Sequence, residues 1–199
     1  MEKYLILEIK PINKSRYKVV CDGCFPFVLY KGELSHYNLA EGGELEEAAL
    51  CEIKEKVLKK RAKKRAMALL EKRDYTEEKL RAKMREGMYP EDIVEDTLEY
   101  LKGYGYINDK RFAERFLEFH GDAMTKYGLK LKLYQKGISS DVIDEVLDDF
   151  ELTDERELIR KIFEKKNFDT ESSTEKEKNR MIRYLVSKGF SMNNIKKML

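Results

Sequence analysis

The feature that most constrains the fold is a pattern of apolar residues that occurs three times, with a period of about 50 residues. In each copy, two apolar residues four positions apart are followed ten positions later by a second such pair. The copies are Leu80, Met84, Val94 and Leu98; Leu129, Leu133, Ile143 and Leu147; and Met181, Leu185, Ile195 and Leu199. A spacing of four places side chains on one helix face, so each copy predicts a helix, a turn and a second helix.

The residues between the two pairs fit a helix–turn–helix connection. Gly137 and Gly189 each lie four positions after the second apolar residue, where the end of a helix favours a positive φ. Ser139 and Ser191 then fall at the N-cap of the next helix. The first copy departs from this, because its glycine comes one residue earlier, at position 87, and a proline at position 90 suits the first turn of a helix.

A third helix is predicted before each pair, because a further apolar stripe precedes it at helical spacing. The stripes are Ala66, Met67 and Leu70; Phe112, Ala113, Phe116 and Leu117; and Leu158, Ile159, Ile162 and Phe163. Three-helix units of this size bury little surface alone, so we expect them to stack on one another. The segment 169–178, which is charged and carries serine and threonine, is the expected flexible joint within the repeats.

The first 43 residues have a different pattern. Segments 3–12, 16–21 and 25–30 are β-prone, and Asp22-Gly23 favours a two-residue type I′ hairpin. A short helix over 33–38 and a long one over 44–73 are expected to follow. The predicted fold is mainly α: three tandem three-helix repeats in an elongated stack, preceded by a small β-meander. We expect domains over 1–43 (the meander), 44–108 (the long basic helix and first repeat), 109–151 (the second repeat) and 152–199 (the third).

Charge is unevenly distributed, although the net charge is only +2. Segment 54–73 holds ten basic and two acidic residues, and segment 141–157 holds nine acidic residues and one basic. A dense row of cations displaces counterions from a nucleic-acid backbone, so the basic segment predicts contact with nucleic acid or an acidic partner. The alternative is a solvated helix surface. The acidic segment can compensate the basic one within the molecule, in a neighbouring molecule, or not at all.

Five tyrosines cluster in the first repeat, near the basic segment. They are Tyr75, Tyr89, Tyr100, Tyr104 and Tyr106. Stacking on nucleic-acid bases is one interpretation. Packing at the seams between repeats is the other, and it is favoured because tyrosine is amphipathic and these residues lie near helix ends.

No residue pattern indicates an enzyme, a cofactor or a metal site. The chain has two histidines and no Walker A, G-x-S-x-G or H-E-x-x-H sequence. Gly103 and Gly105 follow a helix rather than a strand, which indicates a helix end, with Asn108 or Asp109 capping the next helix. Cys21 and Cys24 form a C-x-x-C that lacks further ligands, so we expect packed or half-exposed thiols. Apolar runs too short to cross a bilayer predict a cytoplasmic protein.

Four stretches give the chain its likeness to a known family. They are Ala68-Leu69-Leu70 with Arg73-Asp74-Tyr75-Thr76 and Leu80; Leu101 through Gly105-Tyr106-Ile107-Asn108-Asp109 with Arg111-Phe112-Ala113; Lys136-Gly137-Ile138; and Lys188-Gly189-Phe190. From about residue 62 to its end, the chain resembles the bacterial RecX regulatory proteins. Residues 1–60 look like the β-hairpin extension of some members. The sequence departs from the family where relatives often carry arginines, because segment 125–136 offers lysines, and where they carry a capping glutamate, because position 79 is lysine.

The resemblance implies a non-enzymatic modulator of RecA, acting in homologous recombination, DNA repair and the SOS response. Such a protein binds the filament of RecA on single-stranded DNA and inhibits its ATPase, strand-exchange and coprotease activity. The expected partner- or DNA-binding residues are Lys59, Lys60, Arg61, Lys63, Lys64, Arg65, Lys72, Arg73, Arg111, Lys126 and Lys130. We expect a monomer that binds single-stranded and, weakly, duplex DNA. The alternative is a free-standing DNA-binding repeat protein with a transcriptional or architectural role.

Overall fold

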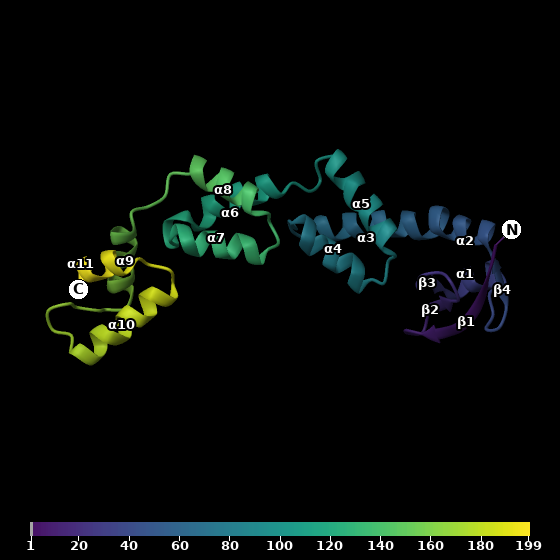
Figure 1. Cartoon of the computed structure of the whole chain (residues 1–199), viewed down its shortest axis with the longest axis horizontal. Coiled ribbons are helices and arrows are strands. Elements are labelled where there is room, and N and C mark those ends of the chain that lie inside the picture. The colour runs from purple at the N-terminus through teal and green to yellow at the C-terminus, as the bar shows by residue number, and fades with distance from the viewer. Residues whose placement is uncertain (1) are drawn as a thin grey trace. The chain divides into compact units, whose positions relative to one another are not determined.

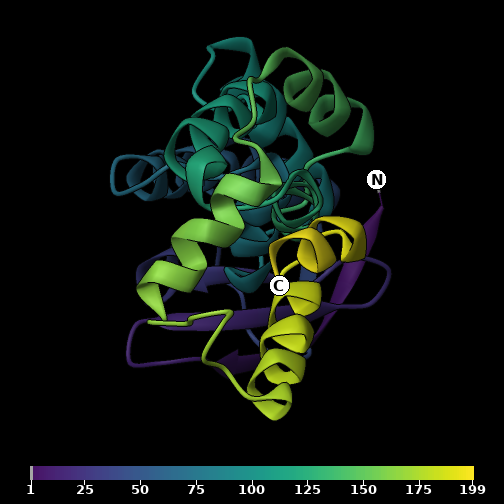
Figure 2. The same ribbon diagram turned by 90° about the vertical axis from the view of Figure 1, so that its left-hand side faces the viewer.

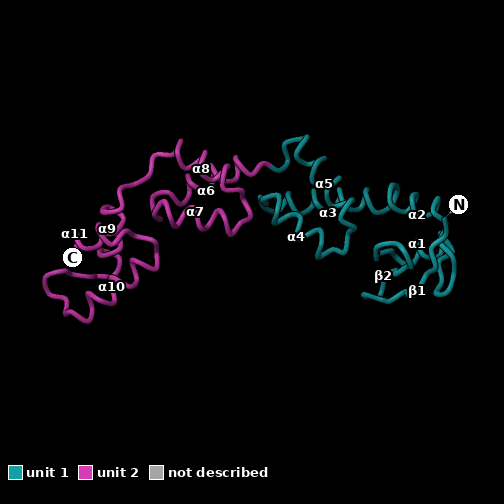
Figure 3. Tube along the Cα trace, in the orientation of Figure 1, with its two compact units in different colours: residues 1–107 teal, residues 108–199 magenta. Residues whose placement is uncertain are grey.

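The computed structural model describes residues 2–199 and confirms a mainly helical chain with a small antiparallel sheet at its N-terminus (Figure 1). It divides into two compact units, Met1–Ile107 and Asn108–Leu199 (Figure 3). The first unit holds the sheet and the first three-helix repeat. The second unit holds the second and third repeats. The finer division into four domains stays a prediction.

The N-terminal sheet has one strand more than the predicted meander. Its strands are β1 (Lys3–Pro11), β2 (Arg16–Cys21), β3 (Phe27–Tyr30) and β4 (Glu44–Glu46), in the order β3-β2-β1-β4 with antiparallel pairing. The fourth strand occupies the start of the segment predicted as a long helix. The predicted type I′ hairpin is also wrong: only Gly23 of the Asp22-Gly23 pair has a positive φ, and Val19 pairs with Phe27 across a longer loop.

The predicted long helix begins at residue 47 and contains a π-helical turn. Its parts are α2 (Glu47–Glu52), the turn (Ile53–Leu58) and α3 (Lys59–Leu70). The buried residues explain the turn, because Ile53 and Leu58 are five positions apart whereas Ala62 and Ala66 continue at intervals of four. Hydrogen bonds from i to i+5 bring residues five apart onto one face. The π turn therefore keeps one apolar face directed to the core along the whole helix.

The first repeat and the sheet share one core. The repeat consists of α3, α4 (Glu77–Glu86) and α5 (Glu91–Gly103), and the short helix α1 (Lys31–His36) follows β3. The predicted pattern residues Leu80, Met84, Val94 and Leu98 are fully buried there, in one cluster with Val19 and other sheet residues. So small a sheet needs a cover for its apolar face, and α2 and α3 with the repeat supply it.

The second unit contains two repeats, each with its own core. The second repeat is α6 (Asp109–His120), a short 3₁₀ turn (Gly121–Ala123), α7 (Lys126–Gln135) and α8 (Ser140–Asp149). The third is α9 (Glu155–Lys165), α10 (Glu175–Ser187) and α11 (Met192–Met198), drawn in light green to yellow in Figure 2. Their buried residues form two separate clusters, so the repeats of this unit do not share the common core that stacking would give.

Thr125 connects these two repeats. Its hydroxyl donates to the carbonyl oxygen of Lys188 at 3.3 Å and accepts from the backbone N–H of Gly128 at 3.0 Å. The residue is 1% exposed. One buried side chain thus caps α7 and contacts the turn between α10 and α11.

The helix ends follow the predicted turn chemistry in most places. Gly137 and Gly189 both have a φ of +86°, Ser139 and Ser191 stand at N-caps, and Asn108 caps α6 by accepting from the N–H of Arg111. In the first repeat, Thr76 caps α4 by accepting from the backbone N–H of Lys79 at 3.3 Å. None of the helices in residues 2–199 is both long and apolar enough to span a bilayer.

Candidate nucleic-acid interface

The basic residues of α3 point in several directions, and part of the row packs against the first repeat. The ammonium of Lys59 forms ion pairs with Glu55 at 2.6 Å and Asp96 at 2.7 Å. The ammonium of Lys63 lies 4.0 Å from the ring centroid of Tyr100. These contacts bring α3 and α5 together, so this side of the helix has a structural role in the first repeat.

Arg61 joins α3 to the sheet. Its guanidinium donates to the carbonyl oxygen of Val28 at 2.9 Å and to the carboxylate of Glu33 at 2.6 Å, and it lies 4.5 Å from the ring centroid of Tyr30. Glu33 also accepts from the backbone N–H of Tyr30 at 2.7 Å. The guanidinium is therefore held in place by contacts with β3 and α1.

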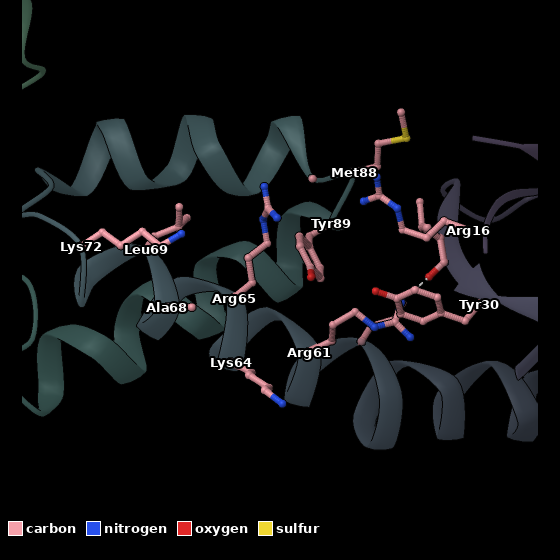
Figure 4. A pocket seen from close by; sticks show the side chains of 13 residues that line it. Arg16, Tyr30, Arg61, Lys64, Arg65, Ala68, Leu69, Lys72, Met88 and Tyr89 are labelled. Carbon is pink, nitrogen blue, oxygen red and sulfur yellow. Dashed lines mark hydrogen bonds between the residues drawn. The ribbon is translucent and has the colours of Figure 1, made fainter. Parts of the chain in front are cut away.

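A pocket of about 340 Å³ lies beside Arg61, between the sheet, α3 and the turn that joins α4 to α5 (Figure 4). Its charged lining residues are Arg16, Arg61, Lys64, Arg65 and Lys72, and none of its lining residues is acidic. In Figure 4, Arg65 lies next to Tyr89, with Lys72 toward one end and Arg16 near Met88 toward the other. Positions 61 and 65 fall on one face of α3 by helical spacing, and Lys72 follows in the turn after the helix.

Positive charge in this pocket is largely uncompensated. Within the described residues, the side chains of Arg16, Lys64, Arg65 and Lys72 form no ion pair. The Nε atom of Arg65 is buried and has no hydrogen-bond partner. A buried donor without a partner costs about 1–3 kcal/mol. A ligand that carries negative charge would compensate the cations that line the pocket.

The positive charge of the pocket also acts on the half-buried side chain of Tyr89. Burial raises the pKa of Tyr89, and the positive charges of Arg61, Arg65 and Arg16 act in the opposite direction. The three guanidinium groups are thus close enough to Tyr89 to act on its phenol. They come from β2 and α3, which are separated in the sequence but adjacent in the first unit.

Three lysines of the second repeat form ion pairs with its own acidic helix. Lys126 contacts Asp148 at 2.9 Å, Lys130 contacts Asp144 at 2.5 Å, and Lys110 contacts Glu145 at 2.7 Å. Three of the five acidic residues of α8 are therefore compensated within their own repeat. All six side chains are about half exposed, and pairs of this kind contribute only about 0–1 kcal/mol, so an anionic partner can exchange for the carboxylates.

The cysteines are packed as predicted. Cys21 is buried and Cys24 is half buried. Burial raises the pKa of the Cys21 thiol to about 12 and also raises that of Cys24. Both thiols therefore stay protonated at neutral pH, where the nucleophilic form is the thiolate.

Comparison with known proteins gives the family. The sequence matches two models of the RecX family. The model of the first three-helix domain matches residues 62–101, and the model of the third three-helix domain matches residues 154–199. Regulatory protein RecX of Clostridium botulinum (strain Eklund 17B / Type B) is 30% identical over 204 residues, which cover 98% of this chain and 94% of that protein. The chain belongs to the RecX family. Regulatory protein RecX of Clostridium beijerinckii is 29% identical, over 96% of this chain and 91% of that one.

Solved RecX structures have the same fold. A crystal structure of regulatory protein RecX aligns with a TM-score of 0.61 at 25% identity and covers 98% of both chains. RecX from Lactobacillus salivarius aligns with a TM-score of 0.56 over 70% of this chain and 93% of that chain. The likeness to the first structure includes the N-terminal sheet, because the alignment leaves almost none of the chain unmatched.

The pocket of this RecX chain brings together four of the binding residues predicted from the sequence: Arg61, Lys64, Arg65 and Lys72. The other predicted binding residues lie outside it: Lys59, Lys60 and Lys63 on α3, Arg73 stacked 4.6 Å from the ring centroid of Tyr75, and Arg111, Lys126 and Lys130 on the second unit. Sequence reasoning missed Arg16, Tyr30 and Met88, and it named Tyr89 only as one of five clustered tyrosines. A helical wheel of α3 would have separated the pocket face from the Lys63 face, but no local signal connects Arg16 to that face.

Proposed function

We propose that this RecX protein is a non-enzymatic, cytoplasmic modulator that binds the RecA filament on single-stranded DNA. It lowers the ATPase, strand-exchange and coprotease activity of the filament in recombination and DNA repair. The observation that carries the proposal is the match to regulatory RecX proteins over nearly the whole chain. The role toward RecA is what the family resemblance implies.

The distribution of cations supports this role physically. Basic side chains occur on both units, around α3 and on α7. A filament repeats its binding surface, so weak contacts made by separate units act together through effective concentration. Neither unit then needs a high affinity of its own.

The test is the rate of ATP hydrolysis by RecA on single-stranded DNA while this protein is titrated in at two salt concentrations. We expect loss of hydrolysis below one protein per RecA protomer, and a weaker effect at the higher salt concentration, because screening reduces electrostatic binding. Unchanged hydrolysis at excess protein would overturn the proposal.

A matched pair of variants locates the face that binds. Changing Lys60, Lys64 and Lys72 to glutamine removes three charges from exposed positions near or in the pocket, whereas changing Lys14, Lys176 and Lys196 removes three exposed charges elsewhere. We expect the first variant to inhibit roughly tenfold less well and the second to inhibit like the parent protein. Equal loss in both would indicate a nonspecific effect of net charge.

The alternative of a free-standing DNA-binding protein predicts tight, sequence-selective duplex binding in the absence of RecA. The third helix of the second repeat argues against it. Helix α8 begins with Ser140 and Asp141 and carries further acidic residues, and so acidic a helix does not suit a major groove lined by phosphates. A selective duplex footprint without RecA would favour this alternative.

A further inference from the structure

We infer that the pocket between the sheet, α3 and the α4–α5 turn is a nucleotide-binding site for single-stranded nucleic acid. Backbone phosphates contact Arg16, Lys64, Arg65 and Lys72, and a base lies against Tyr30 and Met88. The inference rests on the proposed function only because that function names single-stranded DNA as part of the binding partner. It assigns a ligand and a place to a cavity that the N-terminal sheet helps to form.

The need for an anion follows from the charges. Four cations line one pocket of about 340 Å³ without an acidic lining residue, and within the described residues they have no ion pair. Arg61 is already paired with Glu33, so its guanidinium forms part of the pocket lining without needing a further anion. The guanidinium of Arg65 also lines the pocket and has no acidic partner within the described residues, so it can donate to a phosphate oxygen. Guanidinium donors of this kind suit phosphate oxygens.

The length of the basic row favours a strand over a single phosphate group. From Arg61 to Lys72 the backbone advances eleven residues, about 16 Å if fully helical. One phosphate group is much smaller than that, so the row fits successive phosphates of a backbone. Arg16 and Lys72 lie toward opposite ends of the pocket in Figure 4, so the cations are spread along it rather than gathered at one point.

The apolar part of the lining favours a nucleotide over an acidic peptide. Tyr30 is 41% exposed, and Arg61 lies over its ring, which adds a cation–π contact beside any base that stacks there. Met88 is 43% exposed and lines the same pocket. A carboxylate side chain would leave both surfaces uncovered, whereas a base covers them.

A reporter placed at the pocket tests the inference without RecA. The chain contains no tryptophan, so Tyr30→Trp gives a single emission signal at the rim. Tyr127→Trp, at a position 64% exposed on the second unit, is the matched reporter. We expect a 15-residue oligothymidylate to quench the pocket reporter and to leave the other unchanged. Far-UV circular dichroism and the melting temperature show that each variant is folded.

Removing the cations tests the phosphate contacts in the same assay. In the Tyr30→Trp background, changing Lys64, Arg65 and Lys72 to glutamine should weaken oligonucleotide binding at least tenfold. It should also lower the slope of log affinity against log salt by about 2, at 0.7 per lost contact. The control changes at Lys14, Lys176 and Lys196 should alter neither quantity. The site would be overturned if the oligonucleotide bound without changing the emission of the pocket reporter and if the triple variant bound it with the same affinity as the parent protein.

Two competitors separate the sources of the ligand. If ATP quenched the pocket reporter with the same affinity as the oligonucleotide, the ligand would be a free nucleotide rather than a nucleic-acid strand. If poly-glutamate bound more tightly than the oligonucleotide, the ligand would be an acidic protein. The RecA hydrolysis assay is independent of these measurements. Normal inhibition by the triple variant would show that the site has no part in inhibition and would leave the proposed function standing. Oligonucleotide binding at the pocket without any effect on RecA would overturn the proposed function and leave the site standing.

Discussion

The turn between α4 and α5 shows how one residue position keeps its conformation when its amino acid changes. Met88 stands four residues after Met84, as Gly137 and Gly189 do after Leu133 and Leu185, and it has a φ of +59°. The next residue, Tyr89, donates its N–H to the carbonyl of Met84, as the corresponding residues of the other repeats do. The left-handed residue is thus Met88, and the predicted glycine at 87 has an ordinary φ of −77°.

Gly87 is required for space rather than for φ. A Cβ atom at this position would lie 2.9 Å from the ring of Tyr89, which is closer than carbon atoms pack. The tyrosine that lines the pocket therefore packs over a glycine backbone. This contact fixes the ring beside the guanidinium of Arg65.

Changing Met88 to glycine should stabilise the first unit. A left-handed conformation costs an L-residue about 1–2 kcal/mol, and glycine avoids that cost at the expense of greater freedom when unfolded, so we expect a net gain of about 0.5–1 kcal/mol. Urea denaturation measures it. The control is Gly105→Ala, which has a φ of +69° and open space around its Cβ, and which should cost about 1 kcal/mol. A loss of stability in Met88→Gly would show that the methionine side chain contributes more than its backbone costs.

At the scale of an element, helix α9 begins at a charged cap. Asp154 accepts from the N–H of Arg156 at 2.7 Å and from its guanidinium at 2.8 Å. The guanidinium and the backbone N–H hold the pKa of Asp154 at about 2, below its ordinary 3.8. A lowered carboxyl pKa adds stability that is fully present above about pH 4 and is lost as pH falls toward 2.

Changing Asp154 to asparagine should flatten this pH dependence. Asparagine still caps a helix but does not titrate, so the melting temperature of the variant should fall less between pH 4 and pH 2 than that of the parent. Arg156→Gln removes the main cause of the shift and should reduce the same dependence. Parallel curves for all three proteins would contradict the assignment of this cap.

At the scale of the whole molecule, the buried residues form three clusters, one in the first unit and two in the second. Stability is then a property of each cluster, and a repeat opens when its own core is weakened. The first cluster is the one that includes a sheet. The pocket is built on that cluster, so its shape depends on the packing of β2 and β3 against α3.

Changing Leu185 to alanine should weaken only the third repeat. The side chain is fully buried, and its removal should cost about 2–5 kcal/mol. Hydrogen exchange should then accelerate in α9, α10 and α11 and stay unchanged in α3, α4 and α5. Leu98→Ala, at an equally buried position of the first repeat, should give the opposite distribution. Faster exchange throughout the chain in either variant would show that the cores are coupled.

Sequence reasoning succeeded where the determinants are local. The pairs Leu80–Met84 and Leu129–Leu133 predict buried helix faces because residues four apart share a face whatever the helix packs against. It failed at the strand Glu44–Glu46, a short segment whose pairing with β1 depends on a residue pattern far away in the chain. It also failed at the π turn, because a spacing of five between Ile53 and Leu58 has meaning only once the direction of the core is known.

The sequence by itself determined the three helical repeats, their turns and the basic character of α3, because periodicity, capping and charge act between near neighbours. Only the tertiary structure decided which of those cations are free to bind. Lys59 and Lys63 face α5 and are occupied there, whereas Arg65 faces a pocket that Arg16 and Tyr89 complete from the sheet and the α4–α5 turn. Binding sites of this kind depend on contacts between distant segments, and those contacts form only when the chain folds.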